Sequence, residues 1–221
     1  MKTNSSMKTM TARFGSNRTP HAALRLTGAL LPVVLLLCLT AGCGTELRRV
    51  KFQPTPVATI SAAQKLPLSA ALVLDKDFKT YGILVKLVGG DASYQIGDQL
   101  ASYAKDVAAN VFRQVTVVDS ESAAANSADV ILIPKAVRSE YYNAEPLKVL
   151  IVVEWTVKDR AAQQTLWLTS IETESTEHLT LFGFDGHERA AFSRAFDNLS
   201  QKTLKAFNES PEIKRLAVQS K

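Results

Sequence analysis

Two histidines and several acidic residues near the C-terminal third are the first candidates for chemistry in this 221-residue chain. His178 and His187 lie close in sequence to Glu177, Asp185 and Glu188, and zinc accepts imidazole and carboxylate ligands. Their spacing is loose, and neither an HExxH motif nor a nearby cysteine completes a metal site. We therefore expect surface loop residues here and no bound metal.

A second group of possible acid–base residues comprises Glu172, Glu174 and Glu177. Paired carboxylates share a proton in some active sites, but this spacing is more typical of the solvated end of an exposed strand. Gly89-Gly90 and Gly183 to Gly186 lack the lysine or third glycine of a phosphate-binding loop, and there is no Gly-x-Ser-x-Gly elbow. The sequence therefore predicts no catalytic residues, no cofactor and no enzyme activity.

Cys43 is the residue whose surroundings indicate a covalent modification. It follows Leu39-Thr40-Ala41-Gly42 and an apolar run of 11 residues that ends at Leu39. The run is about half of the roughly 20 residues that a membrane-spanning helix needs. Five basic residues and no acidic ones precede it, so residues 1–42 have the three parts of an export signal, whichever of Met1, Met7 or Met10 is the start. We expect lipid attachment at Cys43; an ordinary secretion signal with a chance cysteine is the alternative.

Thr40-Ala41-Gly42-Cys43 resembles the bacterial lipobox. The resemblance implies that the Cys43 thiol receives a diacylglycerol, that a peptidase cuts before it, and that the new amino group is acylated. Thr40 departs from the pattern, which more often has leucine there. Gly44 in place of aspartate after the cysteine implies the outer membrane, facing the periplasm, with the outer leaflet of the inner membrane as the alternative.

The charge balance excludes a nucleic-acid partner once the export signal is removed. Five of the 26 basic residues and none of the 21 acidic ones precede Cys43, which leaves 21 of each in the mature chain. Phosphate binding requires a basic surface, and a neutral chain does not predict one. Cys43 is also the only cysteine that remains, so no intrachain disulfide can form.

The mature chain divides into a tether and one domain. Residues 43–67 contain Pro54, Pro56 and Pro67, and we expect a lipidated tether there. Residues 68–221 are long enough for one domain with its own hydrophobic core. The predicted organisation is therefore a signal peptide at 1–42, a tether at 43–67 and an α+β domain at 68–221.

Hydrophobic periodicity predicts the elements of this domain. Apolar residues at helical spacing predict two amphipathic helices, from Ile96 to Phe112 and from Phe192 to Phe207. Ser210-Pro211-Glu212 predicts the start of a short final helix. Aliphatic and alternating segments predict the strands, at 68–74, 80–88, 115–118, 129–134, 147–158 and 163–173.

We expect the first two strands to form a hairpin through Asp75-Lys76-Asp77, and strand pairing to fail at Pro134. The order ββαββββα indicates an α+β two-layer sandwich with a mostly antiparallel sheet and both helices on one face. Trp155 and Trp167 are expected to join the sheet to the helices. Tyr103 is expected to be a core aromatic with its hydroxyl at the rim.

Aromatic residues in two predicted loops are the remaining candidates for a contact site. Tyr141 and Tyr142 lie in one, Phe182 and Phe184 in the other, and exposed aromatics often mark partner-binding surfaces. For Phe182 and Phe184, plugging the end of the core is an equally good interpretation.

In architecture the chain resembles small accessory lipoproteins of the Gram-negative envelope, such as the YajG-type lipoproteins and the lipopolysaccharide-assembly lipoprotein. We expect a non-enzymatic scaffold or adaptor that binds an envelope protein. The alternative is an auxiliary lipoprotein of a transporter that holds a lipid or small amphiphile between sheet and helices. A cavity between the layers would favour the second role, and a packed core the first.

Overall fold

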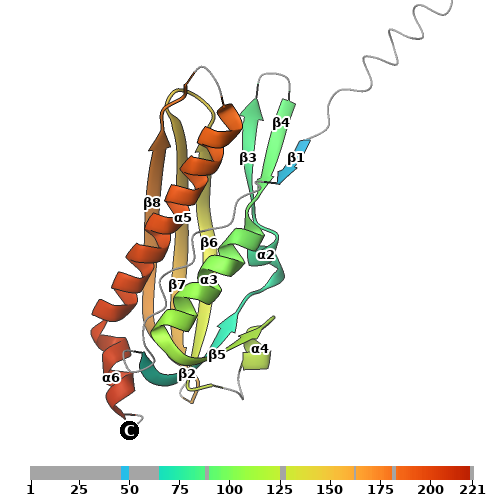
Figure 1. The fold of residues 1–221 in the computed structure, drawn as a ribbon. Coiled ribbons are helices and arrows are strands. Elements are labelled where there is room, and N and C mark those ends of the chain that lie inside the picture. The colour runs from blue at the N-terminus through green and yellow to red at the C-terminus, as the bar shows by residue number, and fades with distance from the viewer. Residues whose placement is uncertain are drawn as a thin grey trace, which may run out of the picture. The chain divides into compact units, whose positions relative to one another are not determined.

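The computed structural model describes residues 46–49, 65–87, 90–124, 128–161, 163–180 and 183–219 (Figure 1). The described strands are β1 (Glu46–Arg49), β2 (Leu66–Val73), β3 (Gly82–Leu87), β4 (Gly90–Gln95), β5 (Phe112–Val118), β6 (Val130–Tyr142), β7 (Leu147–Asp159) and β8 (Thr165–Glu177). The described helices are α2 (Lys76–Lys79), α3 (Gly97–Val111), α4 (Glu121–Ala124), α5 (Phe184–Glu209) and α6 (Pro211–Gln219). None of the described helices is both long and apolar enough to cross a bilayer.

The strands form two sheets, and the larger one is mixed. Its five strands follow the order β5-β2-β6-β7-β8. Strand β2 runs parallel to both β5 and β6, whereas β6, β7 and β8 are antiparallel to one another. The α+β class is confirmed, but the prediction of a mostly antiparallel sheet in the order ββαββββα is wrong. The parallel pairs arise because α3 and α4 intervene between β2 and its two neighbours.

The predicted hairpin between the first two strands is also wrong. Asp75 does not close a turn; its side chain accepts a 2.7 Å hydrogen bond from the Phe78 backbone N–H and caps α2. The chain then leaves the large sheet, and β3 pairs with β4 in a three-stranded sheet of order β1-β4-β3. Sequence analysis missed β4 because its polar residues resemble a turn, although Ala92 and Tyr94 are buried.

Strand β6 continues past the proline at which we expected pairing to fail. Pro134 lies opposite Trp155, and the strand runs on to Tyr142 with one register shift, between Ala136 and Arg138. On its other edge, β6 pairs with β2 only from Val130 to Leu132. No β2 residue is paired at Pro134, so one edge of β6 can accommodate a residue without an N–H group.

The first strand lies inside the segment predicted as a tether. Residues Glu46–Arg49 pair in parallel with β4, with Glu46 opposite Ala92 and Arg49 opposite Gln95. Part of the predicted 43–67 tether is therefore attached to the folded domain. Strand β2 begins at Leu66, two residues before the predicted start of the domain.

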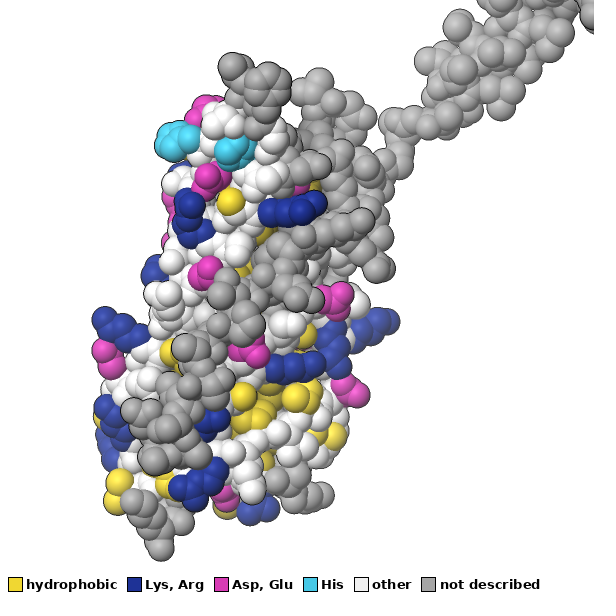
Figure 2. Space-filling view, viewed as in Figure 1, with side chains coloured by type: hydrophobic (Ala, Val, Ile, Leu, Met, Phe, Trp, Pro, Cys, Tyr) yellow, Lys and Arg dark blue, Asp and Glu magenta, His cyan; other side chains and the backbone are white. Residues whose placement is uncertain are grey.

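Both long helices cover the same face of the large sheet, as the hydrophobic pattern predicts (Figure 1). Basic and acidic side chains are scattered over the outer side of the domain that these helices form (Figure 2). Trp155 on β7 is fully buried between the two helices, and its ring contacts Phe207 of α5 at 5.3 Å and Tyr103 of α3 at 6.1 Å between centroids. Trp167 contacts Phe207 at 4.8 Å. The expected role of both tryptophans in joining sheet to helix agrees with these contacts.

The Tyr103 hydroxyl is buried and does not lie at the rim as expected. It accepts a 2.9 Å hydrogen bond from Trp155 Nε1 and lies 2.7 Å from Thr203 Oγ1, which itself donates to the Leu199 carbonyl. The Tyr103 proton is thus directed to Thr203. Burial raises the pKa of Tyr103 well above its ordinary value, so the neutral hydroxyl that this network needs persists.

On the opposite sheet face, α4 covers a second and smaller apolar cluster. Ala124 of α4 and the nearby Ala128 pack on the sheet residues Ala71, Val73 and Ile131. Lys158 on β7 also lies 2.6 Å from Glu121 on α4 in an ion pair. The remainder of this face, on β6, β7 and β8, carries the candidate site.

The buried network predicts a measurable loss of stability when the tyrosine hydroxyl is removed. Tyr103→Phe leaves the buried Trp155 N–H without its acceptor, and an orphaned buried donor costs about 1–3 kcal/mol. Urea unfolding of the mature domain should show this loss in the free energy of unfolding. Tyr142→Phe is the matched control, because that hydroxyl is at an exposed position, and it should change stability by less than about 0.5 kcal/mol. Equal effects of the two substitutions would contradict the network.

Candidate interaction surface

Of the predicted site residues, the structure describes the side chains of Tyr141 and Tyr142. Cys43 and Phe182 lie outside the described residues, and Phe184 begins α5, with only its backbone described. Tyr141 and Tyr142 belong to strand β6, so the predicted aromatic loop around them is wrong. Because successive side chains in a strand point to opposite faces, the two tyrosines have different surroundings.

Tyr141 faces the helices and belongs to the core. It is 5% exposed, and its ring centroid lies 5.0 Å from that of Tyr94 and 5.4 Å from that of Phe192. Tyr142 faces the other side of the sheet and is 50% exposed. Of these two tyrosines, only Tyr142 has an exposed side chain.

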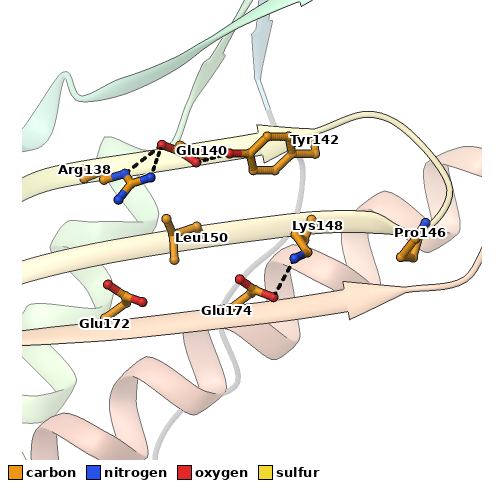
Figure 3. A pocket seen from close by; sticks show the side chains of 8 residues that line it. All are labelled: Arg138, Glu140, Tyr142, Pro146, Lys148, Leu150, Glu172 and Glu174. Atoms are coloured by element: carbon orange, nitrogen blue, oxygen red, sulfur yellow. Dashed lines mark hydrogen bonds and ion pairs between the residues drawn. The ribbon is translucent and has the colours of Figure 1, made fainter.

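Tyr142 lines a shallow depression on the open face of the large sheet (Figure 3). The strand register brings this surface together, since Glu140 lies opposite Leu150, and Leu150 opposite Glu174. The depression has a volume of about 490 Å³. We call it the open-face groove; its lining residues are Arg138, Glu140, Tyr142, Pro146, Lys148, Leu150, Glu172 and Glu174.

The open-face groove has an apolar floor and a charged rim. Leu150 is 7% exposed, although neither long described helix covers its side of the sheet, because the neighbouring charged side chains surround it. Arg138 lies 2.6 Å from Glu140, and Lys148 lies 3.0 Å from Glu174 (Figure 3). Exposed ion pairs of this kind contribute only about 0–1 kcal/mol to stability. A partner can therefore replace them with ion pairs to its own charges with little loss of free energy.

Hydrogen bonding between Glu140 and Tyr142 shifts the pKa of each group. Glu140 accepts hydrogen bonds from the Tyr142 hydroxyl and from Arg138, which lower the pKa of its carboxyl group. The same hydrogen bond to Glu140 raises the pKa of Tyr142. At neutral pH both shifts favour the ionised carboxylate and the protonated phenol that this hydrogen bond requires.

The three acidic residues of the predicted strand end are divided between two surfaces. Glu172 and Glu174 line the open-face groove. Glu177 is on the helix side, where Arg194 lies 2.8 Å and His187 lies 3.7 Å from it. Alternate side chains of strand β8 point to opposite faces of the sheet, so Glu177 faces the helices while Glu172 and Glu174 face the groove.

The two histidines considered for a metal site contact different partners. His187 Nε2 lies 2.8 Å from the Thr180 hydroxyl, and His178 Nδ1 lies 2.8 Å from Glu145 Oε1. The other Glu145 oxygen accepts a hydrogen bond from the Leu179 N–H, which is the main cause of the lowered pKa of that carboxyl group. Within the part of the chain whose side chains are described, no three His, Cys, Asp or Glu residues group together as metal ligands would.

Sequence analysis missed the groove because its parts are 36 residues apart along the chain, from Arg138 to Glu174. The alternation of polar residues on each strand is visible in the sequence. Which residues face one another depends on the register, including the shift between Ala136 and Arg138. Only the paired sheet brings Glu140, Leu150 and Glu174 into one row.

Comparison with known proteins identifies the fold and goes no further. The sequence matches no protein-family model and no curated protein sequence. Among solved structures, a Xanthomonas campestris protein of the DUF330 family is similar with a TM-score of 0.53 and 15% identity, covering 79% of this chain and 99% of that protein.

Two bacterial lipoproteins resemble the chain more weakly. A minor lipoprotein from Acinetobacter baumannii has a TM-score of 0.35 and 12% identity, with 66% of this chain and 94% of that protein covered. Lipoprotein GNA1162 from Neisseria meningitidis has a TM-score of 0.30 and 12% identity, with 60% and 99% covered. Likenesses at this level do not support an argument about function.

Proposed function

We propose that the protein is a membrane-anchored, periplasm-facing lipoprotein that acts as a non-enzymatic scaffold or adaptor in an envelope complex. The packed core beneath α3 and α5 is the observation that supports this role most strongly. A packed core leaves the outer surface of the domain, where the open-face groove lies, as the place for binding. The proposed site of anchoring is Cys43, and the proposed location is the outer membrane.

Around Trp155, described side chains fill the space between the sheet and the helices. Tyr103, Trp155, Phe196 and Phe207 are each 1% exposed or less, and their rings meet at centroid distances of 5.3 to 6.4 Å. A lipid or amphiphile between sheet and helices would have to displace these rings, and core rings are close-packed against their neighbours. The packing therefore favours the adaptor over the ligand-binding alternative.

The open-face groove has the composition of a protein contact. Tyrosine and arginine are enriched in protein interfaces, and here Tyr142 and Arg138 flank the apolar floor at Leu150. Glu140, Glu172 and Glu174 give the rim three carboxylates against the two cations Arg138 and Lys148. A partner with an apolar knob surrounded by more positive than negative charge is complementary to this surface.

The anchor is tested by removing the thiol. With wild-type protein, radiolabelled palmitate should be incorporated and the protein should sediment with membranes. Cys43→Ser leaves no acceptor for the diacylglycerol, so both incorporation and membrane association should be lost. The Cys38→Ser variant is the matched control and should behave as wild type, because Cys38 lies within the predicted export signal. Unchanged membrane association of Cys43→Ser would contradict lipid anchoring.

The adaptor role is tested by crosslinking from the groove. A photoreactive phenylalanine analogue at Tyr142 should form a discrete adduct with an envelope protein in living cells, because this aromatic position is exposed beside the groove. The same analogue at the exposed position Gln201 on α5 is the control. The Leu150→Arg variant, which places a charge on the groove floor, should abolish the adduct at 142. Identical adducts from 142 and 201, or none from 142, would argue against an adaptor that binds through this face.

A further inference from the structure

Strand β1 begins only three positions after Cys43 in the sequence, which limits where a lipid at Cys43 can lie. Glu46, the first residue of β1, is the third residue after Cys43. Three residues span at most about 11 Å even when fully extended. A lipid at Cys43 therefore stays within this distance of the β1 edge of the domain.

The register of β1 shows which end of the domain this edge belongs to. Glu46 lies opposite Ala92, and β1 runs in the same direction as β4. Strand β4 begins at Gly90, two residues before Ala92, which corresponds to about 7 Å of strand. The chain thus enters β1 close to the end at which β3 and β4 are connected.

Other connections lie at the same end (Figure 1). The rings of Tyr94 on β4, Tyr141 on β6 and Phe192 on α5 contact one another, so these three elements are side by side. Strand β6 ends at Tyr142, one residue after Tyr141. Helix α5 begins eight residues before Phe192. Glu145 then joins the β6–β7 connection to His178 and to the Leu179 N–H after β8.

Helix α6 is at the opposite end. From Phe192, α5 continues to Glu209, which at 1.5 Å per residue is about 26 Å along the helix axis. Helix α6 follows directly, after the single residue Ser210. The 11 Å reach from Glu46 cannot bring Cys43 to α6.

We propose that the lipid on Cys43 holds the end of the domain formed by the β3–β4 and β6–β7 connections against the bilayer headgroups, with α6 directed away from the membrane. This orientation rests on the proposed lipidation. Strand β1 then holds the domain at a short distance from the bilayer, and residues 43–67 do not act as a long flexible tether. Tyr142 and Pro146 of the open-face groove lie at the held end, so a partner engages the groove close to the bilayer.

Energy transfer from two labelled positions tests the orientation. Cys43 is the only cysteine of the mature chain, so one added cysteine gives one labelling site once Cys43 is lipidated. The positions are the exposed Asn143 in the β6–β7 connection and Val218 on α6, which is 74% exposed. Full-length lipidated Asn143→Cys and Val218→Cys proteins, each with a fluorescent donor, are reconstituted into vesicles of phosphatidylcholine and phosphatidylglycerol that carry a headgroup-linked acceptor.

Transfer should be several-fold higher from position 143 than from position 218. Inserting a flexible glycine–serine segment between Thr45 and Glu46 should lower transfer from 143 and bring the two values together, because the anchor then no longer restrains the β1 edge. Proteins that float with the vesicles but give equal transfer from both positions would overturn the orientation while leaving the anchor intact. Proteins that fail to float would overturn the anchor and the orientation with it.

Discussion

The contact between Trp155 and Tyr103 is the interaction on which the rest of the domain depends. It joins the central antiparallel strand β7 to α3, and through Thr203 it extends to α5, so one buried hydrogen-bonded chain fixes three elements. Phe196 and Phe207 enclose these groups with rings at about 5 to 6 Å. Because the Trp155 N–H and the Tyr103 and Thr203 hydroxyls each have a hydrogen-bond partner, this network favours one arrangement of the layers over unspecific apolar burial.

This packing determines how the two sheet faces differ. The face under the helices is occupied by the core, with Val149, Ile151, Val153 and Trp155 of β7 all fully buried. The opposite face of the same strand is covered by α4 only at one end, near Lys158. At the other end Lys148 and Leu150 remain part of an accessible groove. One sheet thus carries the core on its helix side and the proposed recognition surface on its open side.

Local patterns predicted the elements whose determinants are close together in the sequence. The helical spacing from Ile96, the alternation along β7 and the cap at Ser210, which accepts a hydrogen bond from the Ile213 N–H at 3.3 Å, all correspond to described elements. The hairpin prediction was wrong because an aspartate such as Asp75 is common both in a turn and as a helix cap. The burial of Phe78, which the structure shows, distinguishes the helix from the turn. The groove could not be predicted, because it depends on the register of β6, β7 and β8. Cys43 lies outside the described residues, so its lipidation remains a prediction.

The central claim is that side chains fill the space between sheet and helices, so that the domain acts through its surface. The most direct measurement is titration of the mature domain with a fluorescent fatty-acid analogue while the tryptophan emission is recorded, since Trp155 lies at the centre of that space. We expect no saturable binding and an unchanged tryptophan emission. Saturable binding with quenching that disappears in the Trp155→Phe variant would show a ligand between the layers and would contradict the account.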